Sequence, residues 1–125
     1  PKYHLIDNAK YALSGLRAAF RDEVSFKIEI GLFVIAQIAI FASPIALIYK
    51  VILGISVFLP LFAELINSAI ERVVDLVTVE FHPLAKAAKD IGSSVVFVSI
   101  IITVAIWLSV FYFIFFRLFY DLFHK

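Results

Sequence analysis

The chain contains no cysteine and few residues that break helices, with four glycines and four prolines among 125 residues. Without cysteine, disulfides and thiolate metal sites are excluded. The four glycines form no phosphate-binding loop of the Walker or protein-kinase type. A formal net charge of +1 provides no concentrated basic face, so we expect no nucleic-acid partner. The sequence therefore shows neither a soluble-kinase motif nor a nucleic-acid site.

Apolar residues dominate the chain instead. Hydrophobic residues make up 63% of it, 14 residues are Phe, and the mean hydropathy is +1.03. A water-soluble domain of this size cannot bury so much apolar surface. The first 29 residues carry charges and include no short apolar stretch before a small-residue cleavage site, so we expect no cleaved signal peptide. The chain is therefore predicted to enter a membrane through internal spans.

Three apolar stretches are long enough to span a membrane as helices, at about 1.5 Å per residue against a hydrocarbon core of about 30 Å. They are residues 30–49, 51–70 and 91–116. Pro44 is expected to mark the far end of the first span. In the third span, Trp107 and Tyr112 are expected to lie at a membrane interface.

Before the spans, residues 5–27 have the spacing of an amphipathic surface helix. Leu5, Leu13 and Leu16 recur on one side, while Lys10 and Arg17 lie on another. The predicted fold class is therefore an all-α membrane protein with three transmembrane helices plus an N-terminal amphipathic surface helix. We predict one domain, residues 1–125.

The basic residues predict the orientation of the chain. Most precede the first span or lie between the second and third: Lys2, Lys10, Arg17, Arg21, Lys27, Arg72, Lys86 and Lys89. The first connection offers only Lys50, and the tail holds Arg117 and Lys125. The positive-inside rule then places the N-terminus and the second loop in the cytoplasm, although the two basic residues of the tail oppose it.

One face of the second span carries acids. Glu64, Asn67, Glu71 and Asp75 fall within an arc of about 80° when each helical residue turns by about 100°. An acidic residue at the centre of a membrane span costs about 2.5 to 3.5 kcal/mol, and such residues usually mark a site. Glu64 alone could still be a packing partner for another helix. The group of four is harder to explain by stability, because it desolvates several like charges.

The acids and lysines of this face suit phosphoryl transfer to a lipid. Carboxylates near the surface can hold Mg²⁺, which prefers oxygen ligands and bridges to phosphates. A carboxylate at the level of the lipid chains can take a proton from a lipid hydroxyl. A different class of function stays open, in which the chain is a small ion carrier or a helical membrane assembly protein with Glu64 as its proton or cation site.

Three segments of the sequence resemble the prokaryotic diacylglycerol kinase family. They are ELINSAIERVVD at residues 64–75, EFHPLAKAAKDIGSSVV at residues 80–96, and GLRAAFRDEVSFKIE at residues 15–29. The resemblance implies a homotrimeric helical bundle of subunits with three spans and a surface helix each, and active sites shared between subunits. It also implies a bacterial cytoplasmic (inner) membrane, ATP as phosphoryl donor and Mg²⁺ as cofactor.

The same resemblance implies roles for individual residues. Glu64 would be the general base on the lipid hydroxyl. Glu23 and Glu71 would be metal ligands that also hold the nucleotide. Asn67, Asp75, Lys89 and Asp90 would position the nucleotide and its phosphates, and Glu80 and His82 would lie near the adenine or ribose. His82 before a proline is, in the plainer interpretation, a turn residue. For Arg17 and Ser93 we predict contacts with the lipid substrate, and we expect Arg17 to anchor to anionic headgroups rather than to contact a nucleotide.

The lipid acceptor is left with two candidates, because the family also has an undecaprenol kinase branch. The segment VDLVTVEFHPLAKAAKD at residues 74–90 resembles that branch. Ile91 to Ser94 and the stretch SFKIE at residues 25–29 resemble the diacylglycerol branch. We favour diacylglycerol as the acceptor and keep undecaprenol as the alternative.

Overall fold

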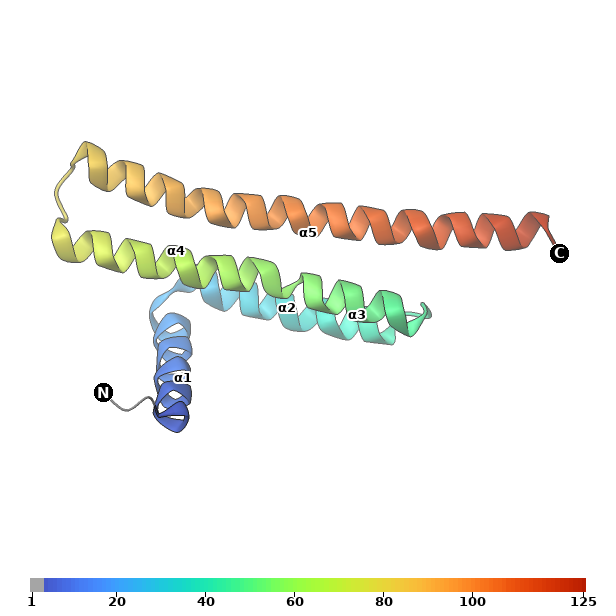
Figure 1. The fold of residues 1–125 in the computed structure, drawn as a ribbon, viewed down its shortest axis with the longest axis horizontal. Helices are drawn as coiled ribbons and strands as arrows, with labels where there is room; N and C mark the ends of the chain where they lie inside the picture. The colour runs from blue at the N-terminus through green and yellow to red at the C-terminus, as the bar shows by residue number, and fades with distance from the viewer. Residues whose placement is uncertain (1–3) are drawn as a thin grey trace.

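The computed structural model describes residues 4–125, and in this part of the chain the regular structure is entirely helical. Figure 1 shows five helices: α1 (Leu5–Asp22), α2 (Val24–Ala42), α3 (Leu47–Ser56), α4 (Phe58–Val77) and α5 (Pro83–Phe123). Val24–Ala42, Leu47–Val77 and Pro83–Phe123 are each long and apolar enough to cross a membrane. The predicted all-α class with three spans is confirmed for the described residues. Lys2, one of the basic residues used for the orientation, lies outside them.

α1 lies crosswise to the other helices at one end of the molecule (Figure 1). It ends at Asp22, earlier than the predicted end at residue 27, because Glu23 has an extended backbone with φ −109° and ψ 111°. The change of direction between a surface helix and a span is made at this single residue. The chain is helical again from Val24, so Lys27 and Glu29 belong to α2 rather than to the surface helix.

α2 covers residues 24–42, whereas the charge-free stretch predicted a span over 30–49. The helix is shifted from that stretch because it includes the charged residues Lys27 and Glu29 and ends before Pro44. Its end agrees with the expectation for Pro44, since a residue before proline is disfavoured in the helical conformation. Lys50 closes the connection by donating from Nζ to the carbonyl oxygen of Phe41 at 3.0 Å.

The second span, predicted over 51–70, is longer and is made of α3 and α4 with a break at Val57. Pro60 explains the break, because it has no N–H to donate to the carbonyl of Ser56. Two side chains of α5 bind Ser56 instead. The Thr103 hydroxyl donates to its carbonyl oxygen at 3.3 Å, and Trp107 donates from Nε1 to its hydroxyl at 2.9 Å. Trp107 therefore lies half-buried between helices.

α5 begins at Pro83 and ends at Phe123, beyond both ends of the predicted span 91–116. The charges near Lys89 and Arg117 interrupt the apolar stretch but do not stop the helix. α5 runs alongside α4 and α3 (Figure 1). The fully buried apolar core is small, with Ile40, Leu53 and Val110 at its centre. Most large apolar side chains face outward, as expected of helices in lipid.

Candidate active site

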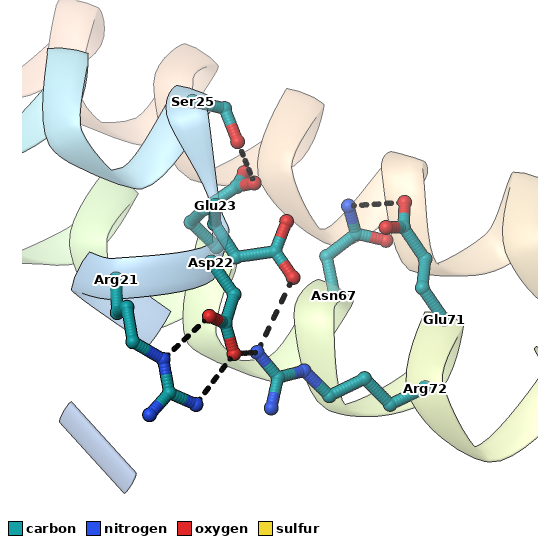
Figure 2. Close-up of polar contacts among 8 residues, drawn as sticks. Arg21, Asp22, Glu23, Ser25, Asn67, Glu71 and Arg72 are labelled. Atoms are coloured by element: carbon teal, nitrogen blue, oxygen red, sulfur yellow. Dashed lines mark hydrogen bonds and ion pairs between the residues drawn. The ribbon is translucent and has the colours of Figure 1, made fainter. Parts of the chain in front are cut away.

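Glu64 lies buried near the middle of α4, with 8% of its surface exposed. Ser25, in the first turn of α2, donates from its hydroxyl to Glu64 Oε1 at 2.9 Å. Figure 2 shows this hydroxyl pointing into the site beside the α1–α2 junction. Among residues 4–125, this is the one hydrogen bond recorded for the carboxylate, and it holds Oε1 only.

Asn67 and Glu71 follow Glu64 on the same face of α4. Asn67 donates from Nδ2 to Glu71 Oε1 at 3.2 Å, a contact drawn in Figure 2. Asn67 is 8% exposed, and its Oδ1 is buried without a hydrogen-bond partner in the described structure. The amide thus fixes the Glu71 carboxylate while keeping one acceptor atom unused.

Gly92 of α5 packs directly against this amide. A Cβ built on Gly92 would lie 2.5 Å from Asn67 Oδ1, closer than real Cβ contacts come. Only glycine lets α5 approach α4 here without moving Asn67. A lone glycine inside a helix was the one signal in the sequence for this contact, and it did not identify the partner.

We therefore expect Gly92→Ala to displace the Asn67 side chain. With Glu71 as the expected metal ligand, the activity of the protein should fall by roughly 10- to 100-fold, the size typical of a lost partner of a metal ligand. Gly31→Ala in α2 is the matched control, since a Cβ at Gly31 meets nothing within 4 Å. Alanine should be neutral or slightly stabilising there. Equal activity of the two variants, measured on purified protein, would refute the close-contact explanation.

The α1–α2 junction brings further acids to the same place. Arg72 of α4 contacts Asp22 at 3.4 Å and Glu23 at 3.7 Å, and Arg21 contacts Asp22 at 2.7 Å (Figure 2). The hydrogen-bonded Arg21 guanidinium holds the pKa of Asp22 below its usual range. Asp22 therefore keeps its charge, and these contacts, until the pH falls below the normal carboxylate range. Because Arg72 follows Glu71, the contacts place Glu23 beside the turn of α4 that carries Glu71.

The remaining predicted nucleotide residues gather around the α4–α5 loop. Lys89 Nζ forms an ion pair with Asp75 Oδ1 at 2.7 Å. On α5, Lys86 Nζ forms another with Asp90 Oδ2 at 2.6 Å. A cavity of about 380 Å³ is lined in part by Glu80, His82, Lys86, Lys89 and Asp90. The structure thus brings four of the predicted residues, Glu80, His82, Lys89 and Asp90, to one cavity, and Asp75 is joined to it through its ion pair with Lys89.

His82 has a structural function at the start of α5, as expected of a turn residue before a proline. Its Nδ1 accepts from the backbone N–H of Leu84 at 3.1 Å and caps the first turn of α5. The turn interpretation is therefore correct, and a contact with a nucleotide would have to use the rest of the ring. Arg17 and Ser93, the residues predicted to touch lipid, are exposed on α1 and α5 and do not line this cavity.

A second cavity, of about 540 Å³, lies between α1 and α4. Small and apolar side chains line most of it, among them Ala12, Gly15, Ala19, Leu65 and Ala69. Arg72 is the one charged residue in the lining. An apolar groove that ends beside acids and an arginine is suited to an amphiphile rather than to a water-soluble metabolite.

Comparison with known proteins identifies the family. Residues 10–111 match the sequence model of prokaryotic diacylglycerol kinase. The chain belongs to the prokaryotic diacylglycerol kinase family. A protein of Haemophilus influenzae named diacylglycerol kinase is 40% identical over 99 residues, which cover 79% of this chain and 84% of the relative. Proteins of the same name from Escherichia coli K12 and Pseudomonas aeruginosa are 39% and 37% identical over 98 residues, covering 78% of this chain and 80% of each relative.

Membership of this diacylglycerol kinase family confirms two predictions from the sequence, the family itself and the class of enzyme, a membrane-embedded lipid kinase. The family match includes every residue placed in the site, from Arg17 to Ser93. Ser25, Gly92, Asp22 and Arg72 were missed as members of the site. Their contacts join different helices, so no spacing within one helix could reveal them.

Proposed function

We propose that the chain transfers the γ-phosphoryl group of ATP to the hydroxyl of diacylglycerol at the membrane surface and so makes phosphatidic acid. One observation carries this proposal. A buried glutamate, Glu64, lies on the same helix face as the Asn67–Glu71 pair, about 10 Å deeper in the membrane at 1.5 Å per residue. A lipid hydroxyl comes from the membrane side and a nucleotide from the water side, so the two substrates would meet on this face.

Glu64 would act as the general base. The diacylglycerol hydroxyl must lose its proton as its oxygen bonds to phosphorus, and the bond between the γ-phosphorus and the β–γ bridging oxygen breaks. A carboxylate within hydrogen-bond reach can take that proton. Ser25 would orient Glu64, since its hydroxyl holds one carboxylate oxygen and leaves the other for the substrate.

The acids at the surface fit Mg²⁺ when the nucleotide is counted as a ligand. Within residues 4–125, no three Asp, Glu or His side chains form a metal site by themselves. Mg²⁺ bound with ATP commonly takes only one or two protein carboxylates, with phosphates and water as the other ligands. Glu23 and Glu71 would be those two, and Asn67 would hold Glu71 in position. When bound, the ion would neutralise part of the phosphate charge.

The cavity at the α4–α5 loop would take the nucleotide. Lys89 would face phosphate oxygens, and Asp75 holds its ammonium group in place. Glu80, His82 and Asp90 line the same cavity. Glu80 and His82 would contact the adenine or ribose, and Asp90 would help to position the nucleotide and its phosphates. The positive charges of Lys86 and Lys89 would draw an anionic ligand to this end of the molecule.

The groove between α1 and α4 would take the acyl chain of the lipid, since its lining is mostly apolar. Arg17 and Ser93 would touch the lipid near its headgroup. We propose the bacterial inner membrane as the location, with the N-terminus and second loop in the cytoplasm, because the basic residues gather at that end.

The active assembly would be a homotrimer. A single chain leaves most of α2 and α5 uncovered, and its apolar core is small. Within one chain, Ser25 contacts Glu64, Arg72 contacts Glu23 and Lys89 pairs with Asp75. Neighbouring copies would complete active sites that are shared between subunits.

Phosphate transfer in mixed micelles tests the proposed reaction. Purified protein with ATP and Mg²⁺ should phosphorylate diacylglycerol, and the cross-linked mass in the same preparation should be that of three chains. Faster phosphorylation of undecaprenol would overturn the choice of acceptor. Phosphorylation of neither lipid would favour an ion carrier instead.

A further inference from the structure

The far end of α5 extends past the rest of the molecule. Ile45, in the connection between α2 and α3, packs into the cluster that contains Val110, and Ile114 packs there too. The tip of this hairpin is therefore level with residues 110–114 of α5. The helix continues to Phe123, about 14 Å further at 1.5 Å per residue. Figure 1 shows this end of α5 alone beyond the hairpin.

Two different faces run along this free end. Val110 and Ile114 face the hairpin, and the same helix face continues with Arg117, Asp121 and His124, within an arc of about 80°. From Phe115 to Phe123, the other positions are apolar or aromatic and exposed: Phe115, Phe116, Leu118, Phe119, Tyr120, Leu122 and Phe123. Within the helix, the charged side chains Arg117 and Asp121 thus lie on the face that loses its protein neighbour at the hairpin tip.

The aromatic face continues the lipid-facing side of the span. Phe97, Ile101 and Leu108 lie on the same side of α5 as Phe115 and Phe119, and all five are half or more exposed. Phe115 and Phe119 stack on each other with ring centroids 6.5 Å apart. A surface that does not change character at the hairpin tip indicates that its surroundings do not change there either.

Composition separates lipid from a second protein helix as the neighbour of this face. Helices that pack closely in membranes use Gly, Ala, Ser and Thr at the contact. Residues 110–125 contain none of these four residue types. They are rich in Phe and Tyr, and tyrosine is enriched where membrane meets water. The family match ends at Phe111, so it assigns no function to this segment.

We propose that residues 112–123 anchor the far end of α5 in the lipid surface opposite the active site. The aromatic face contacts lipid at the border of acyl chains and headgroups. Arg117, Asp121 and His124 face the water above the hairpin tip. The anchor fixes how far α5 rises out of the membrane.

Spin labels test this arrangement in the full chain, because it has no cysteine of its own. Single variants Phe119→Cys and Asp121→Cys, on opposite faces, are labelled and reconstituted into vesicles of phosphatidylcholine and phosphatidylglycerol. Collisions with oxygen, which concentrates in lipid, are compared with collisions with a water-soluble nickel chelate. The oxygen-to-nickel ratio should be severalfold higher at residue 119 than at residue 121.

Two results would overturn the anchor. Equal, high nickel collision rates at both labels would place the segment in water. A label at residue 119 shielded from both oxygen and nickel would show that protein, such as a second copy, covers the face. The pair Phe115→Cys and Arg117→Cys repeats the comparison one turn earlier, so that poor folding of one variant does not decide the outcome.

Discussion

Glu64→Gln should leave the fold intact and lower the turnover of lipid phosphorylation by roughly 10²- to 10⁴-fold, the contribution of a general base. Glutamine has the shape of glutamate and can still accept the hydrogen bond from Ser25. It cannot take a proton from the lipid hydroxyl. Turnover at saturating ATP and diacylglycerol in mixed micelles measures the loss.

Asp121→Asn is the matched control. It makes the same change of acid to amide, but in the last turn of α5, far from the candidate site. This variant should retain wild-type turnover. If Glu64→Gln assembles normally and keeps a similar rate, Glu64 is not the base.

The second large effect concerns magnesium. Glu71→Ala and Glu23→Ala should each raise the Mg²⁺ concentration needed for half-maximal activity by roughly 10- to 100-fold, since even partners of metal ligands have effects of this size. In Glu23→Ala, Arg72 also loses a contact, so a change in stability has to be measured alongside. Titration of activity with Mg²⁺ at fixed ATP gives the requirement.

The control for both variants is Asp7→Ala, which removes an exposed carboxylate from the first turn of α1. Its Mg²⁺ titration should match that of the wild type. Unchanged titrations in both Glu23→Ala and Glu71→Ala would remove these residues as metal ligands.

Much of the fold could be predicted because lipid imposes simple rules. Long apolar stretches must be helical in a bilayer, so the three spans could be read from the sequence. Their ends were less predictable. Glu23 bends the chain for a tertiary reason, and Lys27 and Glu29 are helical although charged. The break at Val57 has a local cause in Pro60, but the side chains that satisfy Ser56 come from α5.

The candidate site also has a part that the sequence could predict and a part that it could not. The acidic face of α4 could be predicted, because Glu64, Asn67 and Glu71 lie on one helix with regular spacing. Contacts between helices could not. The hydrogen bond from Ser25 joins residues 39 apart in the sequence, and Gly92 meets Asn67 from another helix. Such pairs depend on how α2, α4 and α5 pack, which the periodicity of a single helix does not contain.

The most direct test of the account separates nucleotide binding from chemistry. Mn²⁺, a paramagnetic substitute for Mg²⁺, is titrated with a non-hydrolysable ATP analogue into wild-type protein, Glu64→Gln and Glu71→Ala, and bound metal is followed by electron paramagnetic resonance. We predict that Glu64→Gln binds the metal–nucleotide complex as tightly as the wild type while transferring almost no phosphate, and that Glu71→Ala binds it far more weakly. Loss of binding in Glu64→Gln, or wild-type binding in Glu71→Ala, would contradict the division of the α4 face into a deep base and a shallow metal site.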